Sequence, residues 1–166
     1  MIILVVLAAF GLTMSFLVHG STFFGSNILN TFPLVGFLHI GAIIVLLPTF
    51  YVYREVFTGE RRSDFWQLAT INVPKLLRYF CLIFTAYAFF NFFFTIFILN
   101  EGGGPSEING QKVLHSHGNI IRNLTDEEYD LHKAYSKRTF SGHWMVFYCL
   151  AFTALLSNLK GNKLKI

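Results

Sequence analysis

The chain has 166 residues, of which 54% are hydrophobic and only 13% are charged, and its mean hydropathy is +0.52. A soluble domain usually carries about 25% charged residues, so this chain has too few polar side chains to cover its apolar ones with a water-facing surface. The net charge of +4 comes from basic residues in short segments between apolar runs, and no patch interleaves basic with aromatic side chains. Composition therefore excludes an ordinary soluble domain, argues against a nucleic-acid partner and predicts a lipid bilayer as the surroundings.

Four apolar stretches are long enough to cross a bilayer as helices, which takes about 20 residues each. They cover residues 1–18, 34–53, 79–99 and 140–159. A cleaved signal peptide is the alternative for the first stretch, but the stretch lacks the basic start and the small-residue cleavage site of such a peptide. We therefore predict an all-α membrane protein with four transmembrane helices in a single domain over residues 1–166.

The one long polar segment, residues 100–139, separates the third and fourth apolar stretches. After a flexible, glycine-rich exit, its sequence predicts a short hairpin with a turn at Gly118. Thr125 and Glu128 have the spacing of a capping box, in which two side chains satisfy the free N–H groups at a helix start. The segment is therefore predicted to hold a hairpin followed by a helix over residues 126–137.

The connector between the second and third stretches, residues 54–78, is charged at both ends. Its apolar residues between 63 and 73 fit either a short helix that lies in the membrane interface or a plain loop.

Four crossings place both ends of the chain on one side of the membrane. That side carries eight basic residues, whereas the other side carries five basic and six acidic residues. Because cytoplasmic segments are enriched in Lys and Arg, we expect both termini in the cytoplasm of a bacterial inner membrane, or on the equivalent side of an organelle membrane. The eight basic residues are Arg54, Arg61, Arg62, Lys75, Arg78, Lys160, Lys163 and Lys165.

Under this topology all six histidines lie at or near the outer face. His39 and His143 sit at similar depth on two helices, where they could hold a haem or exchange protons with a quinol. His115, His117 and His132 form a candidate site for a transition metal such as copper, zinc or iron, and the first two would share one face of a strand. The alternative for all of them is an interfacial anchor that binds no ligand.

Three further patterns concern the contacts between helices. Gly11 and Ser15, four residues apart, predict a close approach of another helix. Asn91 is the one strongly polar residue near the middle of the third span and should hydrogen-bond to another helix. Asn91 and Trp144 are also our candidates for docking a partner.

The two cysteines fall inside apolar runs. From the rise of a helix, Cys81 and Cys149 should lie roughly 10 Å apart in depth. That separation is too large for a disulfide, so we expect two small buried side chains.

No G-x-S-x-G, H-E-x-x-H or phosphate-loop motif occurs in the sequence, and no charged residue lies inside a predicted span. These absences argue against hydrolytic catalysis and against a channel or carrier. We hypothesise a non-catalytic subunit or accessory protein of a larger membrane complex, whose partners are other integral membrane subunits. The alternative is a small membrane redox protein that binds haem or a transition metal through its histidines.

Overall fold

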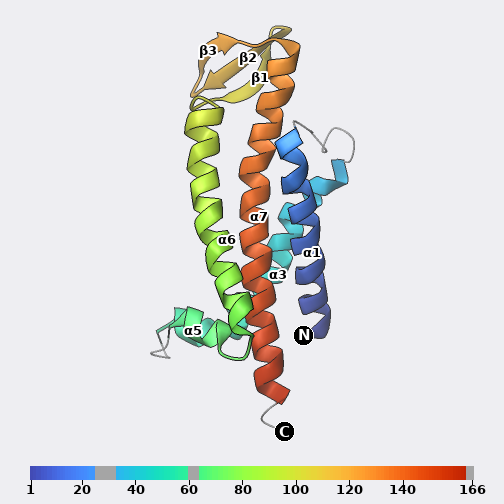
Figure 1. Ribbon diagram of the computed structural model, residues 1–166, viewed down its shortest axis with the longest axis vertical. Coiled ribbons are helices and arrows are strands. Elements are labelled where there is room, and N and C mark those ends of the chain that lie inside the picture. Colours follow the sequence, from blue (N-terminus) through green and yellow to red (C-terminus); the bar gives the residue numbers. More distant parts are fainter. Residues whose placement is uncertain (25–32, 60–63, 164–166) are drawn as a thin grey trace.

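The computed structural model of the protein describes residues 1–24, 33–59 and 64–163. Within them, four helices are long and apolar enough to cross a membrane, and a small three-stranded sheet lies between the third and the fourth of these helices (Figure 1). This architecture confirms the predicted all-α class with four spans. The four candidate spans are Ile2–Phe24, Leu34–Val52, Lys75–Leu99 and Asp126–Gly161.

The first, third and fourth helices extend beyond the apolar runs that predicted them, whereas the second ends one residue earlier. The first two spans are α1 (Ile2–Ser21), continued by the 3-10 turn η1 (Thr22–Phe24), and α3 (Phe37–Val52), preceded by η2 (Pro33–Gly36). The third is α6 (Lys75–Phe93), continued by the π-helical segment η3 (Phe94–Leu99), and the fourth is α7 (Asp126–Lys163). Two short helices, α4 (Arg54–Phe57) and α5 (Phe65–Thr70), connect α3 to α6.

Helix α7 is the centre of the bundle. Of its most apolar stretch 61% is buried within the protein, against 33% or less for the other three spans. In Figure 1, α7 runs between α6 and α1, and the beginning of α1 and the end of α7 lie at the same end of the molecule. At about 1.5 Å per residue its 38 residues exceed the ~30 Å hydrocarbon layer. The predicted outer helix and the predicted fourth span are therefore one continuous helix.

The sheet covers the end of the bundle opposite the chain termini (Figure 1). It is antiparallel in the order β1 (Gly104–Ile108), β2 (Gln111–Ser116), β3 (Asn119–Asn123). The β2–β3 hairpin confirms the predicted turn, since His117 and Gly118 have φ of 48° and 89°.

Strand β1 was not predicted, because the expected flexible exit covered Glu101–Pro105. The signal for it was Asn109-Gly110, the strongest short-range hairpin dipeptide, whose residues adopt φ of 52° and 76°.

The predicted capping box is present at the start of α7. The Glu128 N–H donates to Thr125 Oγ1 at 3.2 Å, and the Thr125 N–H donates to Glu128 Oε2 at 2.8 Å. Arg122 of β3 binds Glu128 at 2.8 Å and Glu101 at 3.0 Å, so one guanidinium ties the sheet to the ends of α7 and η3.

Acid should loosen this junction. The hydrogen bond from Arg122 lowers the pKa of Glu101. A carboxyl with a lowered pKa in the folded state stabilises the fold above its unfolded pKa, and that contribution is lost as the pH falls through the folded value. Between pH 7 and pH 3 we expect amide hydrogen exchange in β3, corrected for intrinsic rates, to accelerate. The same titration in Arg122→Gln should start from faster exchange and show a weaker pH dependence; an identical pH dependence in both proteins would contradict the assignment.

The sequence predicted either a short helix or a plain loop between residues 63 and 73, and the structure has the helix α5 there. Asp64 caps α5 by accepting a hydrogen bond from the Trp66 N–H at 2.8 Å. Ala69 of this helix packs with Tyr53 and Ala154. Ser63, where the predicted helix began, lies outside the described residues.

The predicted separation of the two cysteines is wrong. Cys81 Sγ lies 3.5 Å from the Cys149 carbonyl oxygen and 2.9 Å from Thr153 Oγ1. The depth estimate took the third span to begin at residue 79, whereas α6 begins at Lys75, and Asn72 Nδ2 just before it donates to the Ser157 carbonyl oxygen at 3.1 Å. Both cysteines are free and 1% exposed, as expected for small buried side chains.

Candidate functional site

A cavity of about 460 Å³ lies at the sheet-facing end of the bundle, between α3, α7 and the α6–η3 helix. One face of α7 forms much of its wall, with residues spaced three or four apart as a helical face requires. Across from α7 the cavity is lined by His39 of α3 and by Phe92, Ile96 and Asn100 at the end of the third span. The α7 residues are Ser136, Thr139, Phe140, His143, Trp144 and Phe147.

Both histidines predicted to bind a cofactor, His39 and His143, therefore line the same cavity. This placement required two histidines more than 100 residues apart in the sequence, on α3 and α7, to lie at matching depth. Their hydrogen bonds then determine which ring nitrogen of each histidine carries a proton.

His39 is fixed by Trp144. The indole Nε1–H of Trp144 donates to His39 Nδ1 at 3.1 Å. An indole nitrogen can only donate, so Nδ1 must hold a lone pair and the proton of a neutral His39 must be on Nε2. His39 therefore offers a hydrogen-bond donor.

His143 has the opposite arrangement. Its Nδ1 lies 2.8 Å from the carbonyl oxygen of Thr139, one turn earlier in α7. A carbonyl can only accept, so the Nδ1 atom carries the proton and Nε2 keeps a lone pair. The ring is held edge-on against Phe92, with centroids 5.0 Å apart. His143 therefore offers a hydrogen-bond acceptor.

The remaining wall includes four aromatic side chains and carries no formal charge. Apart from the two histidines, no acidic or basic residue is among the described residues that line the cavity. Since an unpaired charge is costly to bury in apolar surroundings, this cavity suits a neutral molecule. Flat rings pack well against such walls. The aromatic lining residues are Phe92, Phe140, Trp144 and Phe147.

The π-helical segment η3 contributes to the cavity wall. Its wider turns end with the Asn100 N–H donating to the Thr95 carbonyl, five residues earlier, at 2.8 Å. Ile96 and Asn100 both line the cavity. Single π-helical turns recur at functional sites because they redirect side chains from the regular helical register. The irregularity thus coincides with the histidine pair.

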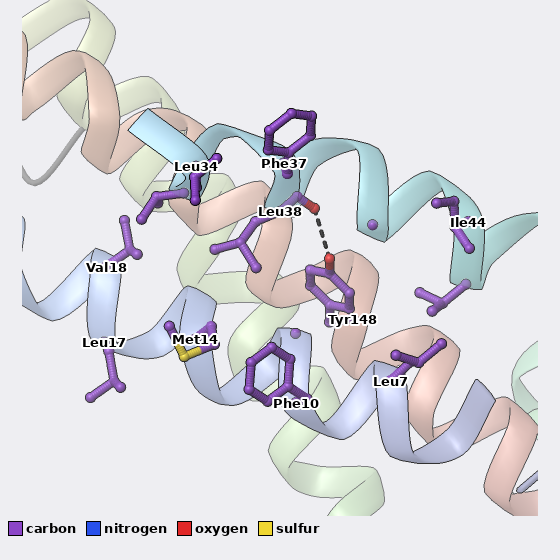
Figure 2. A pocket seen from close by; sticks show the side chains of 14 residues that line it. Leu7, Phe10, Met14, Leu17, Val18, Leu34, Phe37, Leu38, Ile44 and Tyr148 are labelled. Carbon is purple, nitrogen blue, oxygen red and sulfur yellow. Dashed lines mark hydrogen bonds between the residues drawn. The ribbon is translucent and has the colours of Figure 1, made fainter. Parts of the chain in front are cut away.

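A second, larger cavity of about 670 Å³ lies between α1 and α3. Figure 2 shows its side chains, which are almost entirely hydrocarbon. Among the described residues that line it, the one hydroxyl is that of Tyr148, which already donates to the Leu38 carbonyl at 2.8 Å. Binding sites combine apolar walls with a few convergent polar groups, so the smaller, histidine-lined cavity is the better candidate.

The three histidines predicted to bind a metal have other surroundings. His132 is buried, with Nδ1 donating to Asn100 Oδ1 at 2.9 Å and Nε2 lying 3.4 Å from Arg122 Nη2. His115 pairs with Gly104 and Ile120 inside β2, whereas His117 lies in the turn at positive φ. The expected shared strand face of His115 and His117 is therefore absent. No group of three or more His, Cys, Asp or Glu in the described part of the chain could hold a metal ion.

The two predicted docking residues face the interior of the protein. Asn91 and Trp144 are each 4% exposed. Asn91 Nδ2 donates to the Arg138 carbonyl of α7 at 3.2 Å, which supplies the expected bond to another helix. Neither side chain is available on the surface for a partner.

Sequence reasoning missed most of the cavity wall. On α7, the spacing of Ser136, Thr139, Phe140, His143 and Phe147 is a signal that could have identified the lining face. Phe92, Ile96 and Asn100 are also spaced four residues apart, but phenylalanine occurs on nearly every face of this span, so the spacing did not single out a lining face.

Comparison of the chain with protein-family models, with curated proteins and with solved structures found no match in any of the three.

Proposed function

We propose that this multi-pass membrane protein binds a small, neutral, ring-shaped molecule in the histidine-lined cavity. The observation that supports the proposal is the meeting of His39 and His143 in a cavity otherwise lined by aromatic and neutral side chains. A few polar groups in an apolar pocket give a ligand its orientation, while the walls supply the affinity. The site would act as a receptor site within the membrane.

Haem fits these histidines less well. Two axial histidines must each present a lone pair to the iron. Only Nε2 of His143 has one, since the bond from Trp144 places the His39 proton on Nε2. A haem would therefore require the Trp144–His39 hydrogen bond to break.

Fluorescence of Trp144 tests the proposal directly. The sequence holds two tryptophans, so Trp66→Phe leaves Trp144 as the sole reporter. We expect a decyl-substituted benzoquinone to quench Trp144 emission saturably in lipid nanodiscs, and 1-naphthol and indole, which fluoresce themselves, to compete with it in a measurement of bound quinone. Decane, which is apolar but has no ring or polar group, should do neither.

The control variants separate the site from unspecific partitioning into the bilayer. His39→Leu should weaken the response, whereas His115→Leu, which changes a histidine of the sheet, should leave it intact. A response that never saturates, or that is equal in His39→Leu and the parent protein, would refute the proposal.

A second candidate function is that of a subunit docked to other membrane proteins. The supporting observation is the edge strand β3, where Ile120 and Ile121 are 52% and 43% exposed in the segment between the third and fourth candidate spans. Exposed apolar groups outside lipid mark interaction surfaces. The double variant Ile120→Ser/Ile121→Ser should abolish stoichiometric co-purification with other membrane proteins. An unchanged pattern of co-purified proteins would contradict this second function.

We also propose that both termini face the cytoplasm, with the sheet outside. The bias of eight basic residues against five supports this orientation. Compartment-specific tags at the two ends should report from the same, cytoplasmic side.

A further inference from the structure

We infer that the ligand of this cavity is a lipid-soluble hydroquinone, a ring with two hydroxyl groups, held in preference to the corresponding quinone. This inference rests on the proposed ligand-binding function and names the chemistry that the site selects. It follows from the positions of protons on the two histidines.

The first selective element is His143. With its Nδ1 proton engaged by the Thr139 carbonyl at 2.8 Å, the free Nε2 can only accept. A hydroxyl group satisfies it by donating. A quinone carbonyl or a methyl ether oxygen has no proton to donate, so it makes no hydrogen bond with His143 Nε2.

The second selective element is His39. Because Trp144 donates to its Nδ1 at 3.1 Å, the free Nε2–H can only donate. Any oxygen with a lone pair satisfies this donor, whether hydroxyl, carbonyl or ether. His39 therefore binds both redox forms, and His143 distinguishes them.

The third selective element is the aromatic part of the cavity wall. Phe92, Phe140, Trp144 and Phe147 offer flat surfaces, and no acid or base other than the histidines lines the described cavity. A neutral six-membered ring meets both conditions. The cavity lies in the transmembrane bundle, so a ring with an alkyl tail can reach it from the bilayer.

Binding in nanodiscs would test the inference, with empty discs subtracted. The three probes are a decyl-substituted benzohydroquinone kept reduced without oxygen, the matching benzoquinone, and the bis-methyl ether of the hydroquinone. Loss of one neutral hydrogen bond corresponds to about a two- to tenfold change in affinity. We expect the hydroquinone to bind more tightly than the other two by about that factor.

Variants assign the selectivity to one residue. His143→Leu should equalise the three affinities, while His39→Leu should weaken all three and keep their order. His115→Leu is the matched control and should reproduce the parent protein. Selectivity that persists in His143→Leu would overturn the role of His143.

The outcomes distinguish the two proposals. Equal affinities of the three probes in the parent protein would overturn the hydroquinone inference and leave ring binding intact. Absence of saturable binding by any probe, naphthol and indole included, would overturn the proposed function itself.

Discussion

Alanine at Gly11 should displace α1 from α7 and lower the free energy of unfolding by about 1–3 kcal/mol, the usual cost of overpacking a tight interface. A Cβ atom at this position would overlap the ring of Tyr148, whose atoms Cδ1, Cε1 and Cζ are its nearest neighbours. Tyr148 is itself 3% exposed and its hydroxyl donates to the Leu38 carbonyl, so displacing the ring would break that hydrogen bond. The unfolding free energy can be measured in mixed micelles of a mild and a denaturing detergent.

The same helix supplies the control. A Cβ at Gly20 of α1 would meet nothing within 4 Å. Gly20→Ala should therefore be neutral or stabilise the protein by about 0.5–1 kcal/mol, because it removes a flexible residue from a helix. In a Tyr148→Ala background the cost of Gly11→Ala should largely vanish, since the colliding ring is gone. Equal effects of Gly11→Ala and Gly20→Ala would show that the contact is unimportant.

Gly41 of α3 faces the same tyrosine from the other side, where an added Cβ would meet the Tyr148 hydroxyl. One aromatic ring of α7 thus fits against glycines of two other helices and fixes their depth. Since His39 lies two residues before Gly41, this fit also sets the position of His39 beside His143.

The second large effect is expected at His19, whose replacement by leucine should destabilise the protein by about 1–2 kcal/mol. His19 Nε2 accepts from the Tyr87 hydroxyl at 2.6 Å, and its Nδ1 lies 2.9 Å from Ser141 Oγ. The Ser141 hydroxyl donates to the Lys137 carbonyl at 2.8 Å, so the serine oxygen must accept the proton of His19 Nδ1. The side chain thus joins α1 to both α6 and α7.

The expected loss of stability in His19→Leu follows from the strength of hydrogen bonds between helices in a membrane. Hydrogen bonds between transmembrane helices average about 0.6 kcal/mol and reach about 1.7, and His19→Leu removes two while leaving the Tyr87 hydroxyl without its acceptor. Tyr87→Phe removes one bond and should cost about half as much. A double-mutant cycle should then give non-additive losses for His19 and Tyr87. Additive losses, or no loss in His19→Leu, would mean that the network does not stabilise the bundle.

Features that depend on residues close together in the chain were predictable from the amino-acid sequence. Apolar runs of spanning length predicted the four membrane helices, because each helix satisfies its own backbone hydrogen bonds. The capping box of Thr125 and Glu128 and the turn at Gly118 were also predicted, because each is formed by residues within a few positions of one another. The small pair Gly11 and Ser15 correctly indicated a close helix contact, and both residues are buried in α1.

Contacts between residues that are distant in the chain could not be predicted and are seen only in the folded bundle. Cys81 lies beside Cys149, Asn91 and Trp144 face inward, and His39 joins His143 in one cavity. Each of these depends on the relative depth and rotation of helices that are distant in sequence. Depth and rotation are set by packing, as between Tyr148 and its glycines, and by the π-helical turn in η3. Hydropathy reports that a segment is in lipid, but the fit of side chains between helices decides what it faces.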